Sequence, residues 1–124
     1  MGLADAGAFV SSEGLSLGEI RRLLEAEFLS GENLLERRVT RFSSTDLMSH
    51  VLAEAQPGTL LLTSLSSIQV INTAVVADLG GVVFVGGNRP LDPVIDYARS
   101  MSMVTLLTSW AADVVCGRLN VSPL

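Results

Sequence analysis

The sequence contains no lysine, and this absence excludes several kinds of site. All eight cationic residues are arginines, against thirteen acidic residues, so the net charge is −5. Without lysine the chain has neither the phosphate-binding lysine of a P-loop nor a lysine that could form a Schiff base. An acidic chain with scattered arginines is also a poor electrostatic match for nucleic acid. We therefore expect no nucleic-acid partner.

Cysteine and histidine occur only once each. Cys116 alone cannot form a disulfide within the chain, which suits a reducing cytoplasm. His50 is the single histidine and falls on the polar side of its predicted helix, so we expect it at the surface. One cysteine and one histidine do not supply the ligands of a zinc site, and no second histidine is present for catalysis. We expect no metal, no cofactor and no enzyme activity.

Long apolar runs are also missing. No run approaches the roughly 20 residues that cross a bilayer, and the N-terminus lacks the basic start and apolar run of a signal peptide. We therefore expect no membrane contact and a cytoplasmic location. Aromatic residues make up only 5% of a chain that is 48% hydrophobic, so its core must be built from Val, Leu, Ile and Ala. Buried parallel sheets and their helices have this composition.

Short apolar strands alternate with segments of helical periodicity, and 124 residues suit one domain. This alternation predicts an α/β fold, a single three-layer domain in which a mainly parallel sheet is flanked by helices. The predicted strands are 28–29, 39–42, 60–63, 82–85 and 104–107. Residues 1–14 are small, polar and unpatterned, and we expect a flexible leader there. The domain is expected over 15–120, with a fraying tail at 121–124.

Side chains that cap helices mark where the helices begin. Ser16 with Glu19 three residues later forms a capping box, and Asp92 followed by Pro93 is a strong helix start. Other expected caps are Ser44 or Thr45, ahead of a helix with Asp46 in its first turn, and Ser109.

The predicted helix 68–79 is apolar on almost every side. A helix of this kind is expected to be covered on more than one face, and a second copy of the chain could provide that cover. We therefore expect a homodimer. The candidate interface residues are Ile68, Ile71, Val75, Val76 and Leu79.

Polar loops follow the predicted strands. Ligands usually bind where such loops gather at one edge of a parallel sheet, and hydroxyls, helix N-termini and an arginine could hold an anion there. The alternative is that the hydroxyls cap helices and the glycines form turns. The candidate ligand-binding residues are Ser64, Ser66, Ser67, Gly86, Gly87, Asn88, Arg89, Thr108 and Ser109.

Three stretches resemble the DRTGG domain family, namely 14–52, 58–74 and 82–109. The second family signature, TGG after a strand, would fall on Val85-Gly86-Gly87, with valine in place of threonine. The Asp-Arg signature would fall at about Leu65-Ser66 and is absent. The chain is similar to small stand-alone members, some encoded near iron-only hydrogenase genes, to the N-terminal domain of HPr kinase, and to domains beside CBS domains in regulatory pyrophosphatases. This resemblance implies a regulatory or assembly module, commonly dimeric, without catalysis of its own.

Three functions remain open from the sequence. The first is a non-catalytic regulatory or assembly module that homodimerises, with a link to iron-only hydrogenase or metabolic regulation and with a protein partner as a further option. The alternative is a sensor that binds a nucleotide or another phosphorylated small molecule at the strand-end loops. An enzyme is the reading that the residue inventory favours least.

Overall fold

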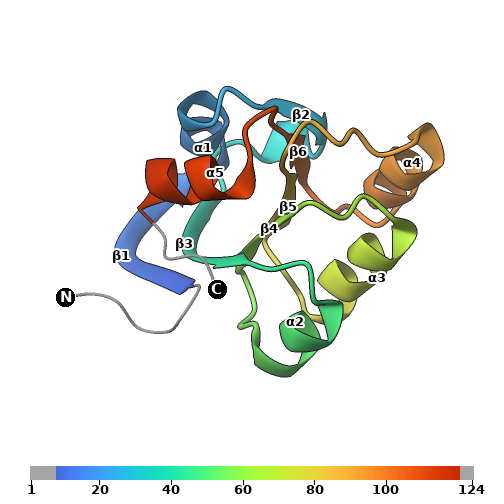
Figure 1. The fold of residues 1–124 in the computed structure, drawn as a ribbon, viewed down its shortest axis with the longest axis horizontal. Coiled ribbons are helices and arrows are strands. Elements are labelled where there is room, and N and C mark those ends of the chain that lie inside the picture. Colours follow the sequence, from blue (N-terminus) through green and yellow to red (C-terminus); the bar gives the residue numbers. More distant parts are fainter. Residues whose placement is uncertain (1–7, 121–124) are drawn as a thin grey trace.

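A computed structural model describes residues 8–120 of the chain (Figure 1). The outer parts of the expected leader and tail, residues 1–7 and 121–124, lie outside the described residues. The structure is built on a six-stranded sheet with the strand order β1-β3-β4-β5-β6-β2. The strands are β1 (Ala8–Ser16), β2 (Glu27–Ser30), β3 (Arg38–Ser44), β4 (Leu60–Thr63), β5 (Gly81–Phe84) and β6 (Thr105–Leu107).

The sheet is mainly parallel. Strands β3, β4, β5 and β6 run parallel to one another, and the two edge strands are antiparallel to their neighbours, β1 to β3 and β2 to β6. The expected α/β fold with a mainly parallel sheet is confirmed.

Helices cover both faces of this sheet. The helices are α1 (Leu17–Leu23), α2 (Met48–Glu54), α3 (Ile68–Val76), α4 (Asp92–Ser100) and α5 (Ala112–Leu119), with a short 3-10 turn η1 (Glu32–Leu34). Helices α2, α3 and α4 connect successive parallel strands and pack on one face, because right-handed crossovers between neighbouring strands place their helices on the same side. Helices α1 and α5 cover the other face, which completes the three layers (Figure 1).

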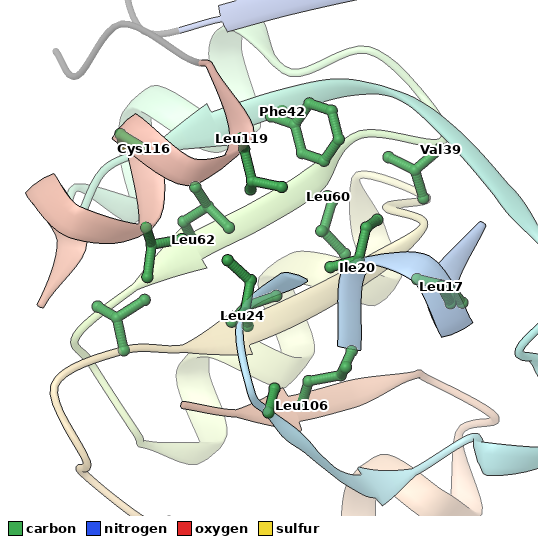
Figure 2. Packing of buried hydrophobic residues seen from close by; sticks show 14 of the residues in the cluster. Leu17, Ile20, Leu24, Val39, Phe42, Leu60, Leu62, Leu106, Cys116 and Leu119 are labelled. Atoms are coloured by element: carbon green, nitrogen blue, oxygen red, sulfur yellow. The ribbon is translucent and has the colours of Figure 1, made fainter. Parts of the chain in front are cut away.

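Each parallel strand contributes side chains to both halves of the core. In β4, Leu60 and Leu62 point to the α1/α5 side while Leu61 points to the α2–α4 side, as the two-residue period of a strand requires. Figure 2 shows the first half, where Leu62 lies near Leu119 and Cys116 of α5. Strands β4 and β5 are buried along their whole length, which explains their unbroken apolar sequence.

The N-terminal boundary differs from the expectation. Residues 8–14, predicted as flexible leader, belong to β1, which pairs with β3 from Ala8↔Ser43 to Ser16↔Arg38 with an irregularity between Val10 and Leu15. Their sequence has little strand character of its own. Pairing with a neighbouring strand satisfies backbone groups that a free segment would leave to water, and single-sequence periodicity does not detect it.

The residues that begin the helices agree with the prediction at α1 and differ from it at three other helices. The capping box at α1 is confirmed, because Ser16 accepts from the Glu19 N–H and Glu19 accepts from the Ser16 N–H. The expected caps Ser44 or Thr45, Asp92 and Ser109 are wrong: α2, α4 and α5 have Leu47, Leu91 and Ala111 at the N-cap, without a side-chain cap bond.

Candidate functional site

The loops after β3, β4, β5 and β6 lie at the carboxyl edge of the parallel strands, together with the start of the antiparallel strand β2. Backbone hydrogen bonds connect these loops. Gly86 N–H donates to the carbonyl of Trp110 at 2.7 Å, and Gly87 N–H donates to that of Thr108 at 3.0 Å. The Asn88 side-chain amide donates to the carbonyl of Ser64 at 3.2 Å. The strand-end loops therefore form one connected surface, as predicted.

An aspartate that was predicted to lie in a helix connects the loop after β3 to the end of β4 and the loop that follows it. Asp46 lies in the loop before α2, and its carboxylate accepts from Thr63 Oγ1 at 2.7 Å, from Ser64 N–H at 2.8 Å and from Ser64 Oγ at 2.5 Å. Partial burial raises the pKa of Asp46, but the hydrogen bonds from Ser64 and Thr63 outweigh it, so this pKa lies below its ordinary value of 3.8. A negative charge thus stands beside Ser64 at neutral pH.

The one arginine of these loops is also paired. Arg89 Nη1 donates to Glu27 Oε2 at 3.1 Å, and both side chains are more than half exposed. An exposed pair of this kind contributes little stability, about 0–1 kcal/mol. The carboxylate of Glu27 nevertheless offsets the positive charge of Arg89, which would otherwise attract an anion. Together with Asp46, Glu27 makes this edge a poor anion site.

The side chains of the β6–α5 loop differ in how far they are buried. Thr108 is buried, and its Oγ1 donates to the carbonyl of Leu24 at 2.8 Å, so this predicted ligand contact is wrong. Ser109 is exposed, and Trp110 is half-buried. The guanidinium of Arg118 lies 4.3 Å from the centroid of the Trp110 ring, a cation–π contact.

The remaining predicted residues have different environments. Ser66 is half-buried, and Ser67 is exposed at the N-cap of α3 without a side-chain cap bond. Gly86 and Gly87 both have φ of +74°, a conformation that glycine adopts without strain. The turn-forming alternative therefore explains both glycines.

The residues that a nucleophilic or metal site would need lie apart from one another in the described part of the chain. Residues 14–18, GLSLG, have the G-x-S-x-G spacing found around nucleophilic serines, but Ser16 has φ of −74° and caps α1. The single histidine, His50, is on α2 at the opposite face of the sheet from α1. Cys116 is buried in the core. Within residues 8–120, no group of three His, Cys, Asp or Glu side chains could hold a metal ion.

The candidate dimer residues on and just after α3 fall into two sets. Ile71 and Leu79 have exposed fractions of 0% and 4% and belong to the core of the chain itself, so their assignment to an interface is wrong. Val76 is 76% exposed, Ile68 is 40% exposed and Val75 is half-buried. Helix α3 lies between two other helices and turns one face to the sheet. Only the second set, Ile68, Val75 and Val76, therefore remains available for an interface.

No family model matches the chain, and no curated protein matches it either. The fold has a counterpart among solved structures. It is similar to the crystal structure of the CBS and DRTGG domains of the regulatory region of Clostridium perfringens pyrophosphatase, complexed with the activator diadenosine tetraphosphate, with a TM-score of 0.75. The match covers 96% of this chain and 51% of that chain, so this chain spans about half its length, at 13% identity. The fold is DRTGG-like.

The signature positions can now be placed on this DRTGG-like fold. Val85-Gly86-Gly87 follows β5 and turns toward the β6–α5 loop, and Leu65-Ser66 lies between β4 and α3. Both positions are at the carboxyl edge. Asp46, whose carboxylate accepts from Ser64 next to the Leu65-Ser66 position, comes from the loop after β3. Its signal in the sequence was an acidic side chain two residues after the end of β3 at Ser44.

Proposed function

We propose that this chain is a non-catalytic regulatory or assembly module that forms a homodimer through its α2–α4 layer. The observation that carries the proposal is the distribution of exposed large hydrophobic side chains. Seven of the nine in the described part of the chain lie on α2, α3 and α4 or within three residues of their ends. They are Leu47, Leu52, Leu65, Ile68, Val76, Leu91 and Met101. Concentration of apolar surface on one layer is typical of a face that another protein covers.

The fold supports a regulatory role, because the similar solved structure belongs to the regulatory region of an enzyme. Among the described residues, the single histidine makes no side-chain hydrogen bond to a serine or a cysteine, and this supports a role without catalysis. The resemblance to small domains encoded near iron-only hydrogenase genes supports metabolic or hydrogenase-linked regulation. No helix in the part of the chain that the structure describes has the length and apolarity to cross a membrane. We place the protein in the cytoplasm because its one cysteine forms no disulfide within the chain.

Light scattering coupled to size-exclusion chromatography tests the dimer. We expect the wild-type protein to elute at twice its monomer mass at micromolar concentration, and Val76→Asp to shift it toward monomer because a carboxylate would be buried in the interface. Val114→Asp is the matched control: Val114 is exposed on α5, on the other face of the sheet, and its variant is expected to remain dimeric. A wild-type monomer, or equal effects of the two variants, would exclude this interface.

A second proposal is that the module senses a nucleotide or another phosphorylated small molecule. It is supported by the nucleotide activator present in the similar solved structure. Ligands that bind only the folded state raise its stability in proportion to the logarithm of their concentration. A thermal-shift series with ATP and inorganic phosphate is expected to raise Tm with increasing ATP. An unchanged Tm with millimolar ATP and with millimolar phosphate would rule the sensor out.

A further inference from the structure

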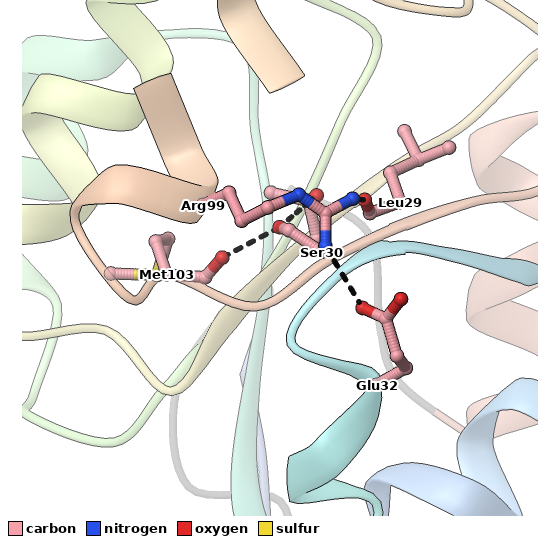
Figure 3. Close-up of polar contacts among 6 residues, drawn as sticks. Leu29, Ser30, Glu32, Arg99 and Met103 are labelled. Atoms are coloured by element: carbon pink, nitrogen blue, oxygen red, sulfur yellow. Dashed lines mark hydrogen bonds and ion pairs between the residues drawn. The ribbon is translucent and has the colours of Figure 1, made fainter. Parts of the chain in front are cut away.

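Two hollows in the described part of the chain lie away from the carboxyl-edge loops. They differ in whether the arginines that line them are already paired within the chain. One, of about 530 Å³, is lined by η1, the end of α4 and Met103. Its arginine is occupied: Arg99 Nη2 donates to the Leu29 carbonyl at 2.6 Å, and Nη1 lies 3.4 Å from Glu32 Oε1 (Figure 3). This arrangement fastens α4 to β2 and leaves no cation for a ligand.

The second hollow, of about 460 Å³, lies between α1, β2 and the segment that leads into β3. Arg21 and Arg22 of α1 and Arg38 of β3 contribute three of the eight arginines of the protein to its lining. Ligand sites for small molecules are typically about 300–1,000 Å³. The hollow thus has the volume of a small-molecule site and a local excess of positive charge in a protein of net charge −5.

The guanidinium groups at this hollow are not all engaged. Arg38 lies 3.8 Å from Glu19 and donates to the carbonyl of Gly14 at 3.2 Å. Arg21 and Arg22 form no ion pair and no side-chain hydrogen bond within residues 8–120, although the charge of Arg22 helps to lower the pKa of Glu19. By contrast, Arg89 and Arg99 each have a carboxylate partner.

The acidic and apolar parts of the lining complete the description. Glu19 accepts from the Ser16 N–H at 2.8 Å in the capping box, so its carboxylate is held in place, and Glu36 is the other acidic residue. Phe28 is half-buried and Leu35 is exposed, so they form an apolar wall. The Gly18 N–H donates to the Leu35 carbonyl at 2.9 Å, which holds this wall against α1.

We propose that the hollow formed by α1, β2 and the segment before β3 binds a phosphate-bearing small molecule with a flat ring, its phosphate on Arg21 and Arg22 and its ring against Phe28. Guanidinium groups bind phosphate through paired, charge-assisted hydrogen bonds. Aromatic side chains stack on flat rings. This site rests on the second proposed function, the sensor. It places the ligand away from the carboxyl-edge loops, where the negative charges of Asp46 and Glu27 oppose an anion. It does not depend on dimerisation.

Amide NMR of the ¹⁵N-labelled full chain, titrated with ATP, tests the location. The expected shifts cluster at Gly18, Arg21, Arg22 and Phe28. Shifts at Ser64, Asn88 and Arg89 instead would overturn this site but keep the sensor, and the absence of shifts with ATP would overturn both. Adenosine without phosphate is expected to bind far more weakly, and equal affinity would contradict phosphate recognition.

Substitution tests the two arginines. Arg21→Gln with Arg22→Gln is expected to weaken ATP binding by about tenfold or more, since one lost hydrogen bond to a charged group accounts for about that factor. Both side chains are exposed and glutamine is a good helix former, so circular dichroism should be unchanged. The matched control is Arg89→Gln, an exposed arginine at the carboxyl edge, which should leave the affinity unchanged. An equal loss in both variants, or no loss in the double variant, would refute the site.

Discussion

Replacing Asp46 with alanine gives the sharpest test of the carboxyl-edge geometry. The substitution removes the acceptor of three hydrogen bonds, from Thr63 Oγ1, Ser64 N–H and Ser64 Oγ, all within 2.8 Å. Because Asp46 is only partly buried, we discount these bonds for solvent and take the cost of losing a helix cap as the guide, about 0.5–2 kcal/mol. For a domain of this size, about 1 kcal/mol corresponds to roughly 4 °C in Tm.

The effect should depend on pH in a defined direction. The folded-state pKa of Asp46 lies below the ordinary value of 3.8, so its contribution to the free energy of unfolding is complete above that value. It is lost as the pH falls through the folded-state pKa, because the protonated carboxyl no longer attracts the donors. Urea titrations at neutral and acidic pH should therefore show a gap between wild type and Asp46→Ala that closes in acid.

Two variants make this measurement specific. Asp46→Asn keeps an oxygen that can accept from Thr63 and the Ser64 N–H, so we expect a smaller loss that does not titrate. Asp96→Ala removes an exposed carboxylate of α4 that makes no side-chain hydrogen bond or ion pair within the described chain, and should change stability by less than about 0.5 kcal/mol. If Asp46→Ala were as stable as wild type at neutral pH, or if its deficit persisted in acid, the hydrogen-bonded cluster would be wrong.

Two further predictions concern local geometry, and both are read from urea or thermal unfolding. Ser16→Ala should lower the free energy of unfolding by about 1 kcal/mol through loss of the α1 cap, while Ser67→Ala, at an N-cap without a side-chain bond, should change it little; equal losses would contradict this difference. Gly31→Ala should cost about 2 kcal/mol or more, because φ is +83° and the new Cβ would lie 2.6 Å from Val104 Cγ2. Gly58→Ala, at φ of +84° with nothing within 4 Å, should cost only about 1 kcal/mol, and an equal cost at both glycines would show that the Val104 contact relaxes freely.

Several features of the fold were readable from short stretches of sequence. The strand Leu60–Thr63 agrees with its prediction at both ends, and the capping box of Ser16 and Glu19 is present as expected. Both signals are local, since an unbroken apolar run and a cap with its third residue need no distant partner. The gathering of the strand-end loops was also predicted, because parallel strands must bring their following loops to one edge.

The roles of individual side chains were less predictable. Asp46 was assigned to a helix, although the structure pairs it with Ser64, eighteen positions away. Thr108 resembled a surface hydroxyl, but its partner is the carbonyl of Leu24, eighty-four positions earlier. A polar side chain that meets a distant partner leaves no periodic pattern in its own neighbourhood.

By itself, the sequence determined which kinds of site this protein lacks and its layered α/β character. Composition and apolar periodicity can be read without knowing which segments of the chain meet. Only the tertiary structure decided that residues 8–14 join the sheet, that Ile71 is core while Val76 faces outward, and which arginines meet carboxylates. These outcomes depend on which segments the sheet brings side by side. That is why Arg89 is paired with Glu27 at the carboxyl edge, whereas Arg21 and Arg22 on α1 form no ion pair within residues 8–120.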